Sequence, residues 1–380
     1  MGDPIHIDGD YKRDGEFFMN VTIGDQPFSL LIDTGSSDLG LAAVGCNGCT
    51  KKFHQYYDPS SSANPMGCDF CKSNATKDTS LRCQDRGGKE KQCTYIVSYE
   101  DDSGFSAALY EDDLKFSPKL KVRAAVGAMY EAKFPNPRAV DGIIGFADLD
   151  VASSGATTPY LELVESGLIE DVFSLCLTSN GGVMYLGEES FLSDDRIVWT
   201  SRLRSSGYYG ITIDDVTIDG KSIDVPSKVF NDGTAIVDSG TSDTCFSSTA
   251  FKAIKSHFGS LCKTTCLKGV CDCEAKKPLQ SQIFESRCVR MNSEDRALFP
   301  DIKIKMNDGA IVSYTPDAYL RSGDVVGCDD EDLFTIAISS NGPDGSGSIL
   351  GDSFMMSYVV IHDRRNHRIG FLELEDGKCP

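Results

Sequence analysis

Long apolar runs are missing from this sequence of 380 residues, although 40% of its residues are hydrophobic. A membrane-spanning helix needs roughly 20 consecutive apolar residues, so we expect no membrane span within the sequence. Residues 1–10 also lack a signal-peptide pattern, and we expect any signal, propeptide or anchor to lie outside the sequence. A chain of this length and composition can instead bury two good hydrophobic cores.

Basic residues are scarce as well. The chain carries 37 Lys and Arg against 57 Asp and Glu, which gives a formal net charge of −20. Such a surface repels polyanions, and this argues against nucleic acid as a binding partner. The charge is compatible with basic peptide substrates, but it can equally serve solubility alone.

Sustained helical periodicity is the third absence. Short β-rich runs, punctuated by Gly, Asp and Ser, recur throughout the chain, and no long pattern of period 3.6 competes with them. We therefore predict an all-β fold with a few short helices.

A short motif that occurs twice is the most informative feature present. Residues 31–36 read Leu-Ile-Asp-Thr-Gly-Ser and residues 236–241 read Ile-Val-Asp-Ser-Gly-Thr, with the aspartates at Asp33 and Asp238. An Ile-Ile-Gly segment ends 112 residues after the first aspartate, and an Ile-Leu-Gly segment ends 113 residues after the second. An internal period this long indicates a duplicated domain, so two similar lobes can each offer one carboxylate.

Asp33 and Asp238 are therefore the candidate catalytic residues. Two carboxyl groups a few ångströms apart do not both ionise readily, so the pair holds one proton over a wide acidic range. The ionised member takes a proton from a water that attacks a scissile carbonyl, and the protonated member hydrogen-bonds the developing oxyanion. This chemistry requires no covalent intermediate, and we expect neither a metal nor a cofactor.

With these motifs the chain resembles the pepsin-like aspartic proteases over nearly its whole length. Residues 16–24 and 368–371 also resemble the first and last strands of that family. The resemblance implies a bilobal fold, aspartic endopeptidase activity, a peptide or protein substrate in the interlobe cleft, and inhibition by statine-type transition-state mimics. We expect a monomer with an N-terminal lobe over residues 1–190 and a C-terminal lobe over residues 191–380.

The neighbours of the two aspartates form matched sets. In each loop a glycine permits a tight turn, and a hydroxyl residue can donate to the outer carboxylate oxygen. By resemblance, a second hydroxyl residue clasps the two loops together. These residues are Gly35 and Gly240, Ser36 and Thr241, and Thr34 and Ser239, respectively. Singly, each Ser or Thr could simply cap a turn, but as matched sets they indicate a catalytic pair.

Fifteen cysteines indicate an oxidising compartment, and we expect the protein in the secretory pathway. Six of them cluster in the first half: Cys46, Cys49, Cys68, Cys71, Cys83 and Cys93. The first four have the spacing of a zinc ribbon, with 18 residues between the two Cys-x-x-Cys pairs. Because two more follow closely, the cluster can also close as three disulfides, which we favour over zinc.

Further cysteine pairs follow from the resemblance. It pairs Cys288 with Cys328 and Cys176 with Cys379. The odd total leaves one thiol over, and we predict that this is Cys245, pointing inward from the strand after the second aspartate loop and without a chemical role.

Two sequons, at Asn20 and Asn74, fit a secretory route. Asn20 falls in a predicted strand, so we predict Asn74 as the glycosylation site. The cysteine-rich insert also resembles the nepenthesin-like branch of the family and, more closely, the plasmepsin V type.

The hairpin around Tyr99 resembles the flap that closes over bound peptide in this family, with Tyr99 as a substrate contact. Most relatives carry a tryptophan after the first motif to hydrogen-bond this tyrosine, but Gly40 stands there in this chain. The flap tyrosine must therefore be positioned differently.

Three acids, Glu100, Asp101 and Asp102, replace the flap glycines. By resemblance, Asp101 lies near a substrate arginine, which predicts an Arg-x-Leu preference and a processing protease. Strand alternation predicts Glu100 and Asp102 on the opposite face. A solvated, unselective acidic tip and a broad-specificity digestive protease stay open as alternatives. A catalytically inactive inhibitor or binding glycoprotein with this fold is a third, although both aspartate motifs are intact.

Overall fold

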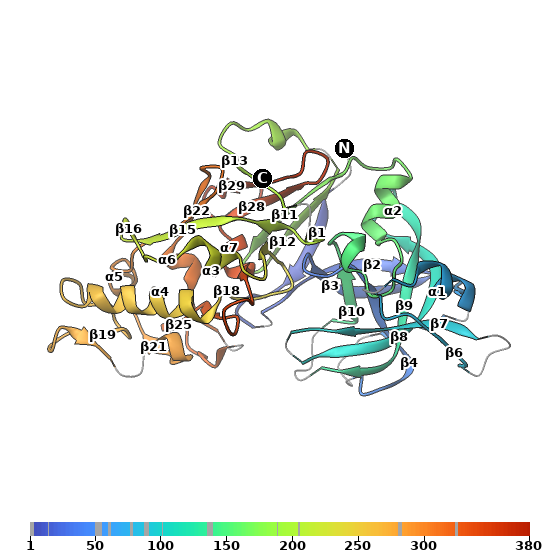
Figure 1. The fold of residues 1–380 in the computed structure, drawn as a ribbon, viewed down its shortest axis with the longest axis horizontal. Helices are drawn as coiled ribbons and strands as arrows, with labels where there is room; N and C mark the ends of the chain where they lie inside the picture. Colours follow the sequence, from blue (N-terminus) through green and yellow to red (C-terminus); the bar gives the residue numbers. More distant parts are fainter. Residues whose placement is uncertain are drawn as a thin grey trace.

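The computed structural model describes residues 4–13, 15–49, 55–59, 62–76, 79–86, 91–100, 102–134, 140–187, 189–203, 206–279, 283–323 and 326–380. Strands dominate, and the longest described helix has 14 residues. Figure 1 shows two lobes, one built mainly from the blue to green first half and one from the yellow to orange second half. The prediction of an all-β, bilobal fold with a few short helices is confirmed. The division at residues 190 and 191 stays a prediction.

The strands follow from alternating apolar side chains. In β2, Phe17, Met19, Val21 and Ile23 are buried and the residues between them are not. The elements of the first half are β1 (Ile5–Gly9), β2 (Phe17–Ile23), β3 (Gln26–Asp33), β4 (Leu39–Asn47), β5 (Asn64–Pro65), α1 (Cys68–Asn74), β6 (Arg82–Gln84), β7 (Gln92–Ser98), β8 (Gly104–Lys115), β9 (Lys121–Lys133), β10 (Gly142–Gly145), α2 (Pro159–Glu165), β11 (Val172–Thr178) and β12 (Gly181–Leu186).

The second half has shorter strands and more helices. Its elements are β13 (Val198–Ser201), β14 (Gly210–Ile211), β15 (Ile213–Ile218), β16 (Lys221–Ser222), α3 (Ser227–Asn231), β17 (Ala235–Val237), β18 (Thr244–Phe246), α4 (Ser248–Leu261), β19 (Cys271–Asp272), β20 (Lys277–Pro278), β21 (Val289–Arg290), α5 (Ser293–Arg296), β22 (Ile302–Met306), β23 (Ile311–Tyr314), α6 (Pro316–Tyr319), β24 (Leu320–Arg321), β25 (Leu333–Ile336), β26 (Ile338–Ser340), β27 (Ser348–Leu350), α7 (Asp352–Met355), β28 (Tyr358–Asp363) and β29 (Arg368–Glu373).

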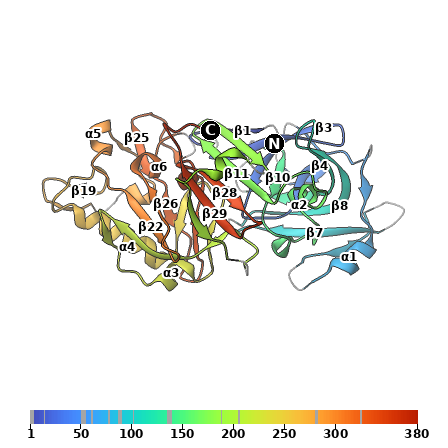
Figure 2. The ribbon, with the colours of Figure 1, turned by 90° about the horizontal axis from the view of Figure 1, so that it is seen from above.

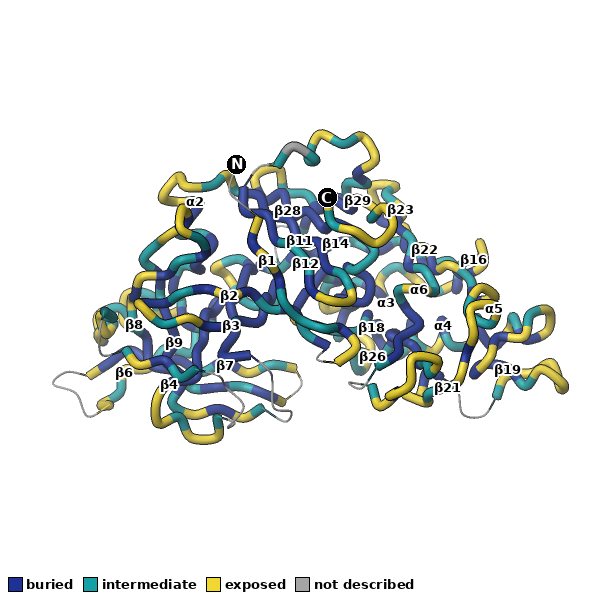
Figure 3. Tube along the Cα trace, turned by 180° about the vertical axis from the view of Figure 1, so that it is seen from behind, coloured by how far each residue is buried: buried dark blue, intermediate teal, exposed yellow. Residues whose placement is uncertain are grey.

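One large sheet connects the two halves. Its main path runs β13-β29-β28-β11-β12-β1-β2-β3-β10-β4-β9-β8-β7-β6. The junction between the halves is the antiparallel pair of β11 and β28, which lie side by side near the centre of Figure 2. Every residue of β28 is buried, and this strand is dark blue in Figure 3. The lobes are therefore joined by a shared, buried sheet.

The two apolar-apolar-glycine segments occupy equivalent places beneath the aspartate loops. β10 pairs in parallel with β3 and antiparallel with β4. β27 pairs in parallel with β17 and antiparallel with β18. A Cβ atom on Gly145 would lie 2.5 Å from the carbonyl oxygen of Ser36, and one on Gly351 would overlap the carbonyl oxygens of Thr241 and Asp243. Only glycine lets these strands thread so close to the loops.

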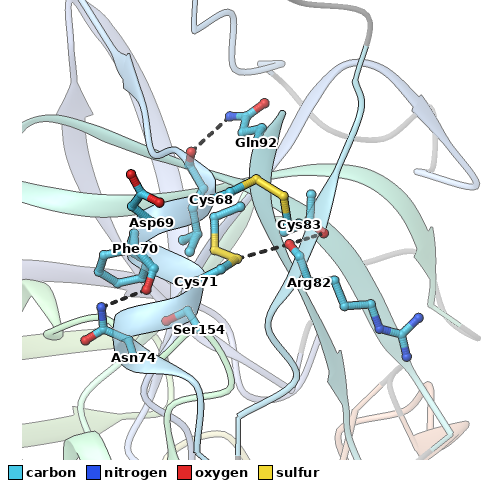
Figure 4. Close-up of a disulfide and its surroundings, with 12 residues drawn as sticks. Cys68, Asp69, Phe70, Cys71, Asn74, Arg82, Cys83, Gln92 and Ser154 are labelled. Atoms are coloured by element: carbon cyan, nitrogen blue, oxygen red, sulfur yellow. Dashed lines mark hydrogen bonds between the residues drawn. A yellow bond between two sulfur atoms is a disulfide. The ribbon is translucent and has the colours of Figure 1, made fainter. Parts of the chain in front are cut away.

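Seven disulfides pair 14 of the 15 cysteines. They are Cys46–Cys49, Cys68–Cys83, Cys71–Cys93, Cys176–Cys379, Cys262–Cys271, Cys266–Cys273 and Cys288–Cys328. The first three close the predicted cluster, and the two pairings expected from the resemblance are present. Figure 4 shows how α1 carries Cys68 and Cys71 toward the neighbouring strand. With all six sulfurs of the cluster in disulfides, none is left to ligate zinc.

Within the described part of the chain, no helix has the length and apolar character to cross a membrane.

Candidate active site

Equivalent loops from the two halves bring Asp33 and Asp238 together. Asp33 ends β3, and Asp238 directly follows β17. Their exposed fractions are only 6% and 7%, and a hydrogen bond joins the two carboxyl groups. The duplicated motif thus places two buried carboxyls in direct contact.

Each carboxylate accepts the same two hydrogen bonds from its own loop. In the first loop, Gly35 N donates to Oδ1 of Asp33 at 2.8 Å and Ser36 Oγ donates to Oδ2 at 2.5 Å. In the second loop, the equivalent bonds from Gly240 N and Thr241 Oγ1 measure 2.8 and 2.7 Å. The two carboxyl groups are therefore held in nearly equal environments.

The glycines also let the loops approach each other. A Cβ atom on Gly35 would lie 2.6 Å from Oδ1 of Asp238, and one on Gly240 would overlap Oδ1 of Asp33. A side chain at either position would separate the carboxyl groups.

Thr34 and Ser239 bond reciprocally across the two loops. Thr34 N donates to Ser239 Oγ at 3.2 Å, and Ser239 N donates to Thr34 Oγ1 at 2.9 Å. Each hydroxyl then donates to a carbonyl of the other half, at Val237 and Ile32, with distances of 3.2 and 2.8 Å. This buried set of four bonds fixes the spacing of the loops.

Burial raises the pKa of Asp238, and hydrogen bonds from Thr241, from Gly240 and from the Asp33 carboxyl offset part of the increase. Asp238 therefore keeps its proton to a higher pH than an exposed aspartate does. This is the behaviour expected of two carboxyl groups that share one proton.

A cleft of about 780 Å³ surrounds the carboxyl pair. Both halves of the chain contribute to its lining, which includes Leu31, Asp38, Tyr99, Glu100, Ile143, Val151, Tyr208, Cys245, Asn341 and Ile349. Among the residues that the structure describes, no Lys, Arg or His lines the cleft. Its charged lining is entirely acidic.

The hairpin of β7 and β8 carries Tyr99 over the cleft. Tyr99 N donates to Ser103 O at 2.9 Å, which closes the turn, and its ring packs against Phe105 with centroids 6.4 Å apart. A Cβ atom on Gly40 would lie 2.7 Å from Phe105 and 2.8 Å from Met129. Phe105 thus occupies the space beside Gly40 and supports the flap tyrosine without a tryptophan.

One of the three flap acids, Glu100, differs from the sequence expectation. Asp101 lies outside the described residues, and Glu100 lines the cleft. The expectation that Glu100 points to the opposite face is wrong, because alternation holds only within a strand. β7 ends at Ser98, and the chain turns before β8 with Asp102 at a φ of 62°.

Two further buried or half-buried acids were missed, although both motifs continue identically to a Ser-Asp pair. Asp38 accepts hydrogen bonds from Ser153 N at 2.9 Å and Ser154 N at 3.0 Å. Asp243 pairs with Arg321 at 2.7 Å. Burial raises the pKa of both carboxyls. Comparing the repeats two residues further would have identified this additional matched pair of acids.

Cys245 is the free cysteine, as predicted, but it lines the cleft in addition to packing inward. Its Sγ lies 3.1 Å from Ser339 Oγ. Burial raises the pKa of the thiol to about 11, so it stays protonated at neutral pH.

Of the two sequon asparagines, Asn20 is exposed and Asn74 is half-buried. Asn74 Nδ2 donates to Phe70 O at 3.0 Å at the end of α1, as Figure 4 shows. Its glycosylation stays a prediction.

A shared hydrogen bond between two buried carboxyl groups, presented by equivalent loops of two β lobes, is the arrangement typical of the bilobal aspartic peptidases. The comparisons with known proteins agree. The family model of the eukaryotic aspartyl proteases matches residues 16–68 and 70–374, and the chain belongs to this family.

The alignments with known relatives span most of this chain and most of each relative. Pepsin A of Bos taurus is 28% identical over 365 residues, which span 94% of this chain and 84% of that protein. Aspartic proteinase 39 of Arabidopsis thaliana is 25% identical over 401 residues, with 97% and 77% covered. Pepsin A of Canis lupus familiaris is 28% identical over 370 residues, with 94% and 81% covered. The protein is an aspartic endopeptidase, and its substrate is a peptide.

Proposed function

We propose that Asp33 and Asp238 are the catalytic residues and that the pair holds one shared proton when substrate binds. The observation that carries this proposal is the hydrogen-bonded pair of buried carboxyls within the cleft, with the pKa of Asp238 raised by burial. A water between the carboxyls then has an ionised acceptor in one member of the pair, and the substrate carbonyl has a proton donor in the other.

The reaction follows from this protonation state. The ionised carboxylate of the pair takes a proton from the water as the water oxygen attacks the scissile carbon, while the protonated carboxyl hydrogen-bonds and protonates the carbonyl oxygen. When the tetrahedral intermediate collapses, the C–N bond breaks, the carboxyl that took the proton from water gives it to the amine, and one hydroxyl of the intermediate returns its proton to the other carboxylate, which restores the pair. Water is consumed, and no covalent link to the protein forms. Gly35, Ser36, Gly240 and Thr241 hold the carboxyls in place throughout, as their hydrogen bonds suggest.

The cellular role follows from the cysteines. Seven disulfides favour an oxidising compartment, and we assign the protease to the secretory pathway with Asn74 as its glycosylation site. The disulfide-closed insert supports a relation to the nepenthesin-like branch and to the plasmepsin V type. A processing protease with an Arg-x-Leu preference fits the acidic cleft. A broad-specificity digestive protease is the second candidate.

The acidic lining supports a preference for basic side chains. Glu100 lines the cleft together with Asp38 and the catalytic pair, and Asp101 follows it directly in the sequence. A substrate arginine that is partly desolvated there would form charge-assisted hydrogen bonds with an acidic side chain.

Cleavage of a diverse, unstructured peptide library by the purified protein tests these proposals. We expect hydrolysis that a statine-type inhibitor blocks, with arginine enriched at one position near the cleaved bond. Inhibitor binding without cleavage would instead indicate an inactive binding protein. Cleavage without any preference for arginine would favour the digestive role.

Replacing the two flap acids one at a time locates the contact. Asp101→Ala and Glu100→Gln should each be compared on an arginine peptide and on a matched norleucine peptide. The residue that binds arginine should lower kcat/KM selectively for the arginine peptide by about 10- to 100-fold. Asp102→Ala is the control within the same turn. Equal small effects of all three would leave the flap a solvated charge cluster.

A further inference from the structure

Asp148, just after β10, binds two buried arginines from the second half of the chain. Its Oδ2 accepts from Arg202, and its Oδ1 accepts from Arg364. The arginine side chains are only 5% and 8% exposed. Arg364 has a second carboxylate partner in Asp171 at 2.8 Å, whereas Asp148 is the acid paired with Arg202 in the described structure. The Asp148–Arg202 pair thus bridges the two halves.

The backbone around Asp148 is fixed to the first catalytic loop. Ala147 N donates to Ser36 O at 2.9 Å, and Ser37 Oγ donates to Asp148 O at 2.6 Å. Asp148 N donates in turn to Gly207 O at 2.9 Å. A movement of Asp148 would therefore displace both the first loop and the segment that contains Gly207.

Arg202 extends this connection into the cleft. Its Nε donates to Tyr208 O at 3.1 Å, and Tyr208 lines the cleft. Burial raises the pKa of the Tyr208 phenol, and the negative charges of Glu100, Asp238 and Asp33 add to the increase. Tyr208 thus lines the same cleft as Glu100 and the catalytic pair.

The same segment also reaches the second catalytic loop. Tyr209 O accepts from Val237 N at 3.1 Å, immediately before Asp238. Tyr209 OH donates back to Phe146 O at 2.5 Å. The contacts form a closed path from the first loop through Asp148 to Tyr208 and on to the second loop.

We propose that Asp148 and Arg202 are positioning residues for the hydrolytic reaction, and that they act by holding Tyr208 in place beside the catalytic pair. Neither residue touches the reacting atoms. Tyr208 itself contacts the bound peptide between the flap and Asp238. This inference rests on the proposed roles of Asp33 and Asp238.

A double-mutant cycle between Arg202 and Tyr208 tests the proposal. Arg202→Lys keeps a cation for Asp148 but removes the Nε donor to Tyr208 O. We expect Arg202→Lys and Tyr208→Ala each to lower kcat/KM by about tenfold. In the Tyr208→Ala background, Arg202→Lys should have almost no further effect on kcat/KM, although it should lower Tm as much as in the native background.

Two further variants separate positioning from stability. Asp148→Asn should reproduce the loss of activity, and Arg202→Lys carries the test if that variant does not fold. Asp171→Asn removes a carboxylate that pairs with Arg364 and, within the described part of the chain, has no hydrogen bond to Arg202 or Tyr208, so it should lower Tm with kcat/KM unchanged. Additive losses of activity that follow Tm in all variants would overturn the proposal.

The affinity of a statine-type inhibitor, measured by calorimetry, gives a second readout. Arg202→Lys should weaken this affinity in the native background and leave it unchanged in the Tyr208→Ala background. If the native protein binds the inhibitor but cleaves no peptide, the proposed catalytic function fails while the positioning of Tyr208 is still decided by the affinities.

Discussion

The two catalytic loops share sequence and local hydrogen bonds but differ in how the acid at their end is neutralised. Asp38 ends the first loop at 4% exposure and accepts hydrogen bonds from the backbone amides of Ser153 and Ser154. Asp243 ends the second loop and pairs with the guanidinium of Arg321. Backbone N–H dipoles of its own half therefore stabilise the first carboxylate, whereas the full positive charge of an arginine stabilises the second.

Tyr11 makes the second loop depend on the N-terminal segment as well. Its hydroxyl donates to Ser242 O at 3.2 Å, and its carbonyl accepts from Arg321 at 3.2 Å. The guanidinium also lies 4.2 Å from the centre of the Tyr11 ring. A repeated sequence thus fixes the shape of a loop, whereas its electrostatic support is built separately in each lobe.

Removing either catalytic carboxyl should cause the largest loss of activity. It should also make the two loops chemically different. Asp33→Asn and Asp238→Asn change the volume very little but eliminate the shared proton. We expect kcat on a peptide substrate to fall by a factor of about 100 to 10,000 or more in each variant. Circular dichroism should show an intact fold. Asp219→Asn, at an exposed turn with a φ of 51°, is the control. Near-native turnover in either variant would contradict the catalytic assignment.

Arg321→Met should distinguish the two loops by stability. It leaves Asp243 without its cation, and we expect a loss of about 3 kcal/mol, at the low end for a broken buried pair because the Asp243 side chain is 28% exposed. Asp38→Asn retains an amide oxygen as acceptor and should cost about 1 to 2 kcal/mol. Urea unfolding measures both values. Equal losses would mean that the charge pair and the backbone dipoles support the loops equally.

The reciprocal bonds of Thr34 and Ser239 should, in contrast, respond symmetrically. Thr34→Val and Ser239→Ala each remove one hydroxyl, and we expect each to lower the free energy of unfolding by about 1 to 2 kcal/mol. The double variant should lose less than the sum, because both variants break bonds of one network. Unfolding in urea gives the coupling. Strict additivity would show that the four bonds act independently.

The smallest expected effect is the change with pH in the stability that Asp38 contributes. Burial raises its pKa above 3.8, so the folded protein binds a proton where the unfolded chain has released it. The contribution of this carboxyl to the free energy of unfolding is present in full below about pH 3.8, and it is lost as the pH rises through the raised pKa. The stability difference between the native protein and Asp38→Asn should therefore decrease with rising pH in urea titrations. A difference that grows with pH would show that folding lowers the pKa of Asp38 instead of raising it.

The accuracy of the sequence prediction varied with the range of the interaction. Asp33 and Asp238 could be found because their chemistry requires a local motif in each lobe. The side of the hairpin on which Glu100 lies could not be predicted, because the alternation of residues in β7 does not show that the strand ends at Ser98. Asp148 gave no signal, since its partners Arg202 and Arg364 reach it only through the folded chain.

The fold class, the two aspartate loops and their apolar-apolar-glycine segments can be recognised from the order of the residues. These features depend on alternation, on glycine and on short hydroxyl side chains, which act over a few neighbouring residues. The sequence also indicated a disulfide-rich insert, because cysteine count and spacing are visible in the chain.

Which charged side chains pair is set only in the folded chain. Arg321 reaches Asp243, Arg202 reaches Asp148, and Glu100 enters the cleft. Each of these outcomes depends on burial and on distances between segments that are far apart in the chain. Coulomb energies change steeply with both quantities, and neither can be read from the order of the residues.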